Sequence, residues 1–550
     1  MEIKAVMHLG RFKDIVVTLF RYGFDDVVER LDLPGKVLFE KIRKVDREMD
    51  TWERIRHMLV DLGPTYIKFG QIMSLRPDLI PRPLILELRK LQDEVAPVEY
   101  GDIREVVEKN LQRPLSEVFS LFDEKPLAAA SLAQVHRAIL RENKEVVAVK
   151  VQRPRIRQVI EPDLYILKLI AGQLYERMEW GKTYDLPKLV QEIRKTLLRE
   201  LDFTREARHM KICRNNFSEM DEVYIPRLYE DYCSERVLTM ELVQGIKMKD
   251  LGPDHDLDRQ LLARRGLRLT VKQVLEDGFF HADPHPGNVM ILDDNVFCLM
   301  DWGMVGRLTR KTRYELIDLI NSVVDKDSER IEEILLDLAR ADGSRPEPRM
   351  EREILDILDV YHSLAIQDLN LGQLLLDITT MLRENNLRVP ADLAVMIKAL
   401  ITAEGTAREL YPELNVVEEA EPFVKRLAME RWKPQVLWRD LRRNFSTLFT
   451  LQKELPLRLR QIVEKIDRGE LNIRFQHANL GGLRNTLENI TNRLTLGIII
   501  AALIVASSMI ITTGVKPLLF GFPALGIIGY LVSGVLGLWL VVNILRSRKF

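Results

Sequence analysis

HADPHPGNVMILDDNVFCLMDWG, from His281 to Gly303, is the stretch from which the rest of the chain can be interpreted. It contains Asp283, with Asn288 five residues later, and Asp301 in an Asp-Trp-Gly triplet; a predicted hairpin with the turn Asp293-Asp294-Asn295 separates them. Phosphoryl transfer requires an aspartate that orients or deprotonates the attacking hydroxyl, an asparagine that holds one magnesium ion, and a second aspartate that holds magnesium against the nucleotide phosphates. We therefore assign Asp283 as catalytic and Asn288 and Asp301 as metal ligands.

The same stretch has two simpler interpretations. His281, Asp283 and His285 alternate, so on an extended strand they would share one face and could ligate zinc. Pro284 and Pro286 would interrupt such a strand, however, and no fourth ligand is evident. An ordinary aspartate-rich loop is the other alternative. The phosphoryl-transfer hypothesis requires upstream partners, so the rest of the sequence tests it.

Composition limits the class of protein. At 550 residues the chain is long enough for two or more folding units. A net charge of −1 gives no electrostatic footprint for nucleic acid, so no nucleic-acid partner is expected. The three cysteines, Cys213, Cys233 and Cys298, lack CxxC spacing. This pattern argues against a disulfide framework or structural zinc and indicates a reducing compartment.

The first upstream partner is a lysine. PLAAASLAQVHRAILRENKEVVAVKVQRP, from Pro126, predicts strands around a small-residue turn, and the last strand ends at Lys150. Such a lysine can reach the α- and β-phosphates of a nucleotide that a loop covers. Here Ala128, Ala129, Ala130 and Ser131 replace the usual glycines, which predicts a tighter and less adaptable nucleotide site. The simpler alternative is a buried strand that ends in a solvent-seeking lysine.

The second partner is an acidic residue on a helix. Apolar residues recur at helical spacing between Leu186 and Phe217, and the same segment holds Glu200, Asp202 and Glu206. A kinase-like N-lobe pairs a helix glutamate with the strand lysine, and we predict Glu200 in this role. An ordinary acidic helix face is the alternative.

A connection between two lobes follows. Val237 to Gly245 predicts a strand ending in glycine, and the backbone around Glu241 and Val243 is a candidate to receive an adenine. A long predicted helix, from about Leu257 to Asp277, then leads to the aspartate-rich stretch. The strand lysine, the helix glutamate, the lobe connection and the aspartate-rich stretch thus occur in the order that the chemistry requires.

Two helical segments precede the predicted lobes. The N-terminal residues place basic side chains among Val, Leu and Phe, which predicts an amphipathic helix that either lies on an anionic membrane or packs on its own domain. Near residue 60, turn signals enclose a short helix with Lys68 and Gln71 on one face. By itself this second segment would be a solvated helix.

Five short segments carry a family resemblance: KFGQ at Lys68 to Gln71, AAAS at Ala128 to Ser131, Glu200-Leu201-Asp202, HADPHPGN from His281, and Asp301-Trp302-Gly303. Over about residues 1–430 the chain resembles the UbiB family of atypical, protein-kinase-like proteins. In that family the K-x-G-Q segment lies across the site where protein kinases admit a peptide, so the resemblance implies a regulatory role for Lys68 and Gln71. Asp202 completes the family's E-x-D segment, and Glu206 is grouped with these regulatory residues. Trp302 replaces the Phe of many kinase-like proteins, which should affect packing more than metal binding.

The resemblance also implies cofactors and partners. ATP and Mg²⁺ are the implied cofactors, with slow ATPase or small-molecule kinase activity that supports ubiquinone biosynthesis. The implied partners are a membrane lipid or polyprenyl quinone precursor and quinone-biosynthesis enzymes. A nucleotide-binding scaffold without chemistry and a true protein kinase are the alternatives. The sequence disfavours a protein kinase, because an apolar-periodic helix is under way by Tyr314 and leaves little room for an activation loop.

The C-terminal part is of a different kind. Leu494 to Val515 is a run of 22 residues without a charge, and Pro517 to Leu545 is another of 29; each is long enough to span a bilayer. Basic residues flank both ends, so the positive-inside rule places the termini of the predicted hairpin and the catalytic domain in the cytoplasm, at a bacterial inner membrane. Gly529, Ser533 and Gly537 form a small-residue stripe that either packs on the first span or forms a homodimer.

The expected fold class is therefore α+β, a bilobal protein-kinase-like fold with a helical N-terminal extension, an expanded helical C-lobe and a C-terminal two-helix transmembrane hairpin. The expected boundaries are 1–120 for the extension, 121–245 for the N-lobe, 246–430 for the C-lobe, 431–493 for a helical stalk and 494–545 for the hairpin.

Overall fold

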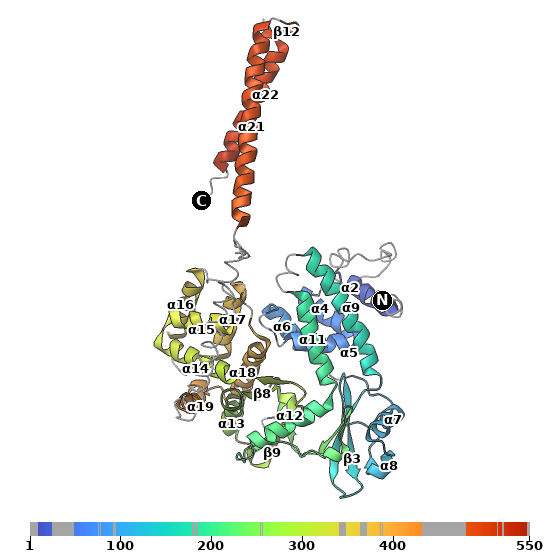
Figure 1. Ribbon diagram of the computed structural model, residues 1–550. Helices are drawn as coiled ribbons and strands as arrows, with labels where there is room; N and C mark the ends of the chain where they lie inside the picture. The colour runs from blue at the N-terminus through green and yellow to red at the C-terminus, as the bar shows by residue number, and fades with distance from the viewer. Residues whose placement is uncertain are drawn as a thin grey trace, which may run out of the picture. The chain divides into compact units, whose positions relative to one another are not determined.

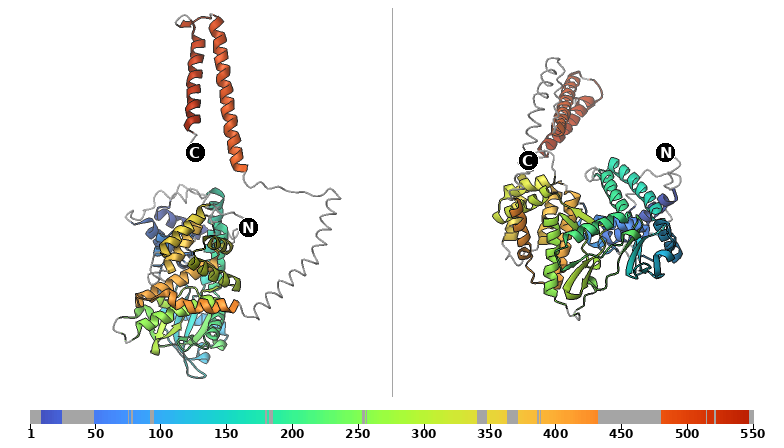
Figure 2. Two further views of the ribbon diagram at one scale, coloured as in Figure 1. Left: turned by 90° about the vertical axis from the view of Figure 1, so that its left-hand side faces the viewer. Right: turned by 60° about the horizontal axis from the view of Figure 1, so that its bottom comes forward.

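The computed structural model describes residues 9–24, 49–74, 76, 79–91, 95–178, 181, 185–252, 255, 257–339, 348–362, 371–385, 387, 389–431, 480–513, 515–519 and 522–546. The chain forms two compact units, residues 1–440 and 441–550. In the first unit the C-lobe helices gather on one side, while the extension helices and the N-lobe sheet lie on the other (Figures 1 and 2). This mixture of helices and sheets confirms the α+β part of the expected fold class.

The N-lobe is built on an antiparallel sheet with the strand order β1-β3-β4-β6, and β2 pairs with β3. The strands are β1 (Phe119–Phe122), β2 (Ala128–Ala129), β3 (Ala133–Leu140), β4 (Val146–Gln152) and β6 (Val237–Glu241). Nearly every second residue of β3 is fully buried, because alternate side chains of a strand point to opposite faces of the sheet. Lys150 lies inside β4, so the predicted strand end falls two residues short.

Helices build the N-terminal extension and cover the sheet. They are α2 (Leu9–Arg21), α4 (Thr51–Leu62), α5 (Pro64–Ser74), α6 (Arg82–Leu88), α7 (Tyr100–Leu111), α8 (Leu115–Val118), α9 (Ile156–Arg177), α11 (Leu186–Glu200) and α12 (Phe203–Asn216). The amphipathic helix α2 buries Ile15 and Val16 and packs on α4 and α9. Arg11 donates a hydrogen bond of 2.7 Å to the buried carboxylate of Asp163. Of the two alternatives for this helix, the structure supports packing on its own domain.

The segment from Leu186 to Phe217 is two helices rather than one. α11 ends at Glu200, and α12 begins at Phe203. Asp202 is the N-cap of α12, because its carboxylate accepts a hydrogen bond of 3.1 Å from the N–H of Thr204. The break turns the second helix in a new direction, which decides the partner of the strand lysine.

The C-lobe combines helices with one four-stranded and one two-stranded sheet. Its helices are α13 (Arg259–Lys272), continued by a π-helical turn η4 (Gln273–Asp277), and α14 (Arg310–Asp325), α15 (Ser328–Leu338), α16 (Pro348–His362), α17 (Leu371–Glu384), α18 (Ala391–Leu410) and α19 (Val416–Arg431). Its strands are β5 (Val223–Tyr224), β7 (Ile246–Lys247), β8 (Phe279–His281), β9 (Val289–Leu292), β10 (Val296–Leu299) and β11 (Val305–Arg307). β9 and β10 pair antiparallel around Asp293–Asn295, which confirms the predicted hairpin.

The second unit contains α21 (Leu480–Thr513), β12 (Leu518–Leu519), β13 (Phe522–Pro523) and α22 (Ala524–Arg546). Leu494–Thr512 is long and apolar enough to cross a membrane, whereas Ala524–Leu540 is a shorter apolar helix. Most of the expected stalk, residues 432–479, lies outside the described residues, and residues 480–493 belong to α21.

The small-residue stripe of α22 packs in part on α21. A Cβ atom added at Gly529 would come within 2.0 Å of the Ser507 hydroxyl, so only glycine permits this approach. Ser533 is also buried, whereas nothing lies within 4 Å of a Cβ at Gly537. The interpretation in which the stripe packs on the first helix is thus supported at Gly529, and the homodimer stays a prediction.

Candidate functional site

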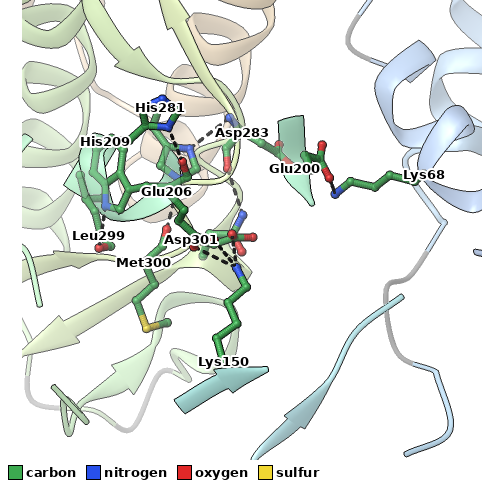
Figure 3. A network of polar contacts seen from close by, with 12 residues as sticks. Lys68, Lys150, Glu200, Glu206, His209, His281, Asp283, Leu299, Met300 and Asp301 are labelled. Atoms are coloured by element: carbon green, nitrogen blue, oxygen red, sulfur yellow. Dashed lines mark hydrogen bonds and ion pairs between the residues drawn. The ribbon is translucent and has the colours of Figure 1, made fainter. Parts of the chain in front are cut away.

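Lys150 is the centre of the site (Figure 3). Its ammonium nitrogen lies 2.9 Å from each carboxylate oxygen of Glu206 and 2.9 Å from Oδ1 of Asp301. The side chain is 17% exposed and its nitrogen lies 5.4 Å from the centre of the Phe203 ring. The N-lobe strand β4, the helix α12 and the end of the aspartate-rich stretch therefore meet at one cation.

Electrostatics keep Lys150 and Asp301 ionised, whereas burial raises the pKa of the Glu206 carboxyl to about 7. Burial alone would lower the pKa of Lys150, but the charges of Asp301 and Glu206 outweigh it and raise that pKa. The Lys150 ammonium in turn holds the pKa of the Asp301 carboxyl below its usual range. Lys150 is therefore a cation and Asp301 an anion at neutral pH.

The prediction that Glu200 pairs with Lys150 is wrong. Glu206, in the first turn of α12, is the partner, whereas Glu200, at the end of α11, lies 2.9 Å from the ammonium of Lys68. The reason is the helix break, because it turns the first turn of α12 toward β4. Asp202 could have indicated this helix break from the sequence. An aspartate is a common N-cap, so it marks the start of a new helix that contains Glu206 but not Glu200.

The two metal-ligand candidates are held close to the catalytic candidate by the backbone. The Asn288 amide nitrogen donates a bond of 3.2 Å to the carbonyl of Asp283, and the N–H of Met300 donates one of 3.0 Å to the carbonyl of Asn288. Asp301 adopts a φ of 55°, a left-handed conformation that costs energy for a residue with a side chain. The side chain of Asp301 is 51% exposed, so a carboxylate of the type that Mg²⁺ prefers is accessible here.

Asp283 has a partner that the sequence analysis missed. Lys398, in the middle of α18, places its ammonium 2.9 Å from Oδ1 of Asp283. Burial alone would raise the pKa of the Asp283 carboxyl, but the charge and hydrogen bond of Lys398, together with the nearby histidines, outweigh burial and lower it. The missed signal was a lone lysine in AVMIKALI, residues 394–401, where only a paired charge can be buried.

The two histidines of this stretch have structural roles. The Nδ1 of His281 accepts a bond of 3.1 Å from the N–H of Asp283, and its Nε2 lies 3.1 Å from the carbonyl of Met300. The Nδ1 of His285 accepts a bond of 3.1 Å from the N–H of Gly287. In the described ranges no three His, Cys, Asp or Glu side chains are grouped as a metal site. The structure therefore gives the zinc alternative no support.

The alanine loop is fixed in place. Ala128 and Ala129 form β2, the N–H of Ala130 donates 2.8 Å to the carbonyl of Ala133, and Ser131 is buried. The guanidinium of Arg153, another residue that the sequence analysis missed, donates 2.7 Å to the carbonyl of Ala130. These bonds agree with a loop that adapts little.

The two backbone positions that are predicted to receive an adenine differ in their hydrogen bonds. The N–H of Glu241 donates 2.8 Å to the carbonyl of Arg227, and the Glu241 carboxylate accepts from the Tyr224 hydroxyl at 2.5 Å. No backbone bond to Val243 occurs within the part of the chain that the structure describes. Of the two predicted positions, Val243 is the one whose backbone is available.

The K-x-G-Q helix is α5, which approaches the site from the extension. Its Lys68 pairs with Glu200, and the amide nitrogen of Gln71 donates 3.3 Å to the carbonyl of Leu91. A Cβ at Gly70 would lie 2.4 Å from a methyl carbon of Leu91, so the glycine permits close packing. The position of Lys68 next to Glu200 agrees with a regulatory element, while the role itself stays a prediction.

These features define a class of protein. A lysine on a central strand pairs with a glutamate on a neighbouring helix and with Asp301, and Asn288 bonds to the backbone of Asp283. This is the arrangement of a protein-kinase-like fold.

Comparison with known proteins gives the family. Residues 90–335 match the ABC1 atypical kinase-like domain, residues 354–415 the UbiB helical domain, and residues 478–546 the ABC1/UbiB kinase-like C-terminal domain. The chain belongs to the ABC1/UbiB family of atypical kinase-like proteins, as the sequence resemblance predicted.

Individual relatives cover most of the chain. An uncharacterized protein in the hydrogenase 1 5′ region of Clostridium pasteurianum is 31% identical over 98% of this chain and 99% of its own. The probable protein kinase UbiB of Cellvibrio japonicus is 33% identical over 79% and 80%, respectively, and that of Vibrio cholerae is 31% identical over 96% and 98%. A solved structure of Mycobacterium tuberculosis Rv3197 with erythromycin has a TM-score of 0.47 and 22% identity, and it covers 66% of this chain and 93% of its own.

Proposed function

We propose that this protein is a membrane-anchored atypical kinase or ATPase that binds Mg-ATP and supports the biosynthesis of ubiquinone or another isoprenoid quinone. It would act on, or extract, lipid precursors rather than phosphorylate proteins. The observation that carries this proposal is the position of Lys150 between Glu206 and Asp301. A phosphate oxygen can replace Asp301 as a partner of the ammonium, and the released carboxylate is then available to a metal ion.

Each residue then has one task. Glu206 holds Lys150 at the nucleotide phosphates, and Asp301 and Asn288 would hold magnesium, which neutralises charge on the transferring phosphoryl group. Asp283 orients the attacking hydroxyl or accepts its proton. Lys398 helps to keep the Asp283 carboxylate ionised, because its charge and its hydrogen bond oppose the effect of burial.

Membrane anchoring is supported by the second unit. Leu494–Thr512 has the length and composition of a membrane span, and α22 is apolar over Ala524–Leu540. A lipid substrate is confined to the bilayer, so an anchored catalytic unit meets it at a high effective concentration. Family membership supports the link to quinone biosynthesis.

A protein kinase is a rival, since several relatives are called probable protein kinases. Only short segments follow Asp301 here: β11 begins at Val305 and α14 at Arg310, which leaves little room for a peptide platform. A scaffold that binds nucleotide without chemistry is the second rival. It is favoured by the ion pairs that already occupy Asp283 and Asp301.

The test is ATP hydrolysis by the full chain in liposomes, with and without a mimic of a polyprenyl quinone precursor. We expect a rate that the mimic stimulates and that Asp283→Asn abolishes. Transfer of phosphate to an added protein would favour the protein kinase, and nucleotide binding without turnover would favour the scaffold.

Nucleotide binding is tested separately by thermal unfolding. Mg-ATP at about a hundred times its dissociation constant should stabilise the protein by about 2.7 kcal/mol. Asp301→Asn should abolish this stabilisation because a metal ligand is lost, whereas Asp293→Asn in the exposed hairpin turn should retain it. Equal stabilisation of Asp301→Asn and the unchanged protein would contradict the assignment.

A further inference from the structure

A cavity of about 210 Å³ is lined by residues of α6, α17 and α18. Its wall includes Lys398, the residue that pairs with Asp283. The volume is below the roughly 300–1,000 Å³ of sites for drug-sized ligands, so it suits the head of a molecule. Leu86 and Arg89 at its edge are exposed, which leaves the cavity accessible from solvent.

The charged residues that line the cavity are mostly cations. They are Arg82, Arg89, Lys398 and Arg408, with Glu404 as the one carboxylate among the described lining residues. Glu404 is already satisfied, since it lies 3.0 Å from Arg408 and accepts a hydrogen bond from the N–H of Gly372 at 2.5 Å. The cavity therefore keeps an excess of positive charge.

Two of these cations have no ion-pair partner among the described residues, although the nearby charge of Asp283 opposes the effect of burial on the pKa of Arg89. Neither Arg82 nor Arg89 forms a hydrogen bond or ion pair with a carboxylate in the described ranges. The third cation is only partly used, because an ammonium has three donors and Lys398 spends one on Asp283. Three cations around one small cavity provide the donors that a carboxylate or phosphate group requires.

Part of the remaining wall is apolar. It is formed by Ile85 and Leu86 of α6, Leu376 of α17 and Ile401 of α18, next to the polar side chains of Ser74 and Gln373. A ligand with an anionic group and an apolar body matches both surfaces.

We propose that this cavity binds the anionic head, a carboxylate or a phosphate, of an amphiphilic small molecule, and that Arg82, Arg89 and Lys398 are its ligands. The role of that molecule as phosphoryl acceptor rests on the proposed function, because only then does a site one side chain away from Asp283 serve the reaction. The binding itself does not depend on nucleotide chemistry.

The test is calorimetric titration of the full chain in detergent micelles, without nucleotide, using benzoate, phenyl phosphate and neutral benzyl alcohol as probes. We expect saturable binding of at least one anion and none of the alcohol; preference for benzoate identifies a carboxylate ligand, and preference for phenyl phosphate a phosphate ligand. Arg89→Gln should weaken binding by about tenfold or more, since a hydrogen bond to a charged group contributes roughly 1.5–3 kcal/mol. Its thermal midpoint checks that the variant folds.

The matched control is Lys90→Gln, which removes the same charge from the next residue, an exposed side chain outside the cavity. It should bind the anions as the unchanged protein does. The inference is overturned if no anion binds, if Arg89→Gln binds equally well, if both variants lose affinity equally, or if Mg-ATP displaces the probe competitively. Because failure of ATP hydrolysis would leave these titrations unaffected, the two proposals fail separately.

Discussion

Lys150 and Lys398 each hold one aspartate of the site at 2.9 Å, but their surroundings differ. Lys150 stands on the strand β4 and shares its charge between two carboxylates, Glu206 and Asp301. Lys398 stands on the helix α18, has Asp283 as its carboxylate partner and faces a cavity lined by further cations. The first lysine thus faces two carboxyl groups, whereas the second belongs to a region with excess positive charge.

The difference assigns the two lysines different tasks. A cation between two carboxylates is ready to exchange one of them for a phosphate oxygen. A cation at the edge of a positive cavity instead keeps a single carboxylate ionised and directs a second anion toward it. We call Lys150 with Glu206 and Asp301 the Lys150 cluster, and Lys398 with Asp283 the Lys398 cluster. Variants that change one cluster and leave the other intact can separate these tasks.

The largest effect is expected in the Lys150 cluster. Glu206→Gln should weaken Mg-ATP binding by roughly ten- to a hundredfold, because a charged hydrogen-bond partner contributes about 1.5–3 kcal/mol to positioning the lysine. Glu200→Gln is the matched control, since it removes the same charge from the neighbouring helix, where the partner is Lys68. Titration with Mg-ATP measures both. A larger loss in Glu200→Gln than in Glu206→Gln would contradict the pairing found here.

An intermediate effect is expected in the Lys398 cluster. With Lys398 present the pKa of Asp283 lies below its usual value, so the carboxylate is ionised at all pH values above about 4. Its contribution to stability is present in that range and is lost as the pH falls below it. In Lys398→Met burial dominates, and the acidic limb of the ATPase pH profile should move to higher pH by about 1–3 units.

The control for this profile is Lys425→Met, because Lys425 forms an ion pair with Glu421 on the exposed surface of α19. Its acidic limb should coincide with that of the unchanged protein. An unshifted limb in Lys398→Met would show that Asp283 does not depend on its lysine.

The smallest effect on the site is expected from Trp302→Phe. Trp302 is fully buried, and its indole N–H donates 3.2 Å to the carbonyl of Leu299. Losing that bond and some ring volume should lower the free energy of unfolding by about 1–3 kcal/mol while Mg-ATP affinity is unchanged, because Asp301 stays in place. Urea unfolding and Mg-ATP titration measure the two quantities. Ile334→Val, a core variant on α15, is the control for destabilisation alone. If Trp302→Phe lost Mg-ATP affinity and Ile334→Val did not, the indole ring would be shown to position the metal ligand.

The sequence by itself determined the order of the parts and most of the chemical groups. The β9–β10 hairpin, the position of Lys150 on a strand and the closeness of Asp283, Asn288 and Asp301 depend on local turn chemistry and short spacings. Such features are encoded within a few residues, and a pattern of alternating or helical periodicity reveals them.

Only the tertiary structure decided which distant groups meet. The choice of Glu206 over Glu200 depends on the direction of α12 after a two-residue break, and periodicity does not specify direction. The pair of Lys398 and Asp283 joins residues 115 apart in the sequence. Such a pair depends on how helices pack around the C-lobe core, because packing of many apolar side chains, rather than any local signal, sets the positions of the charges that they carry.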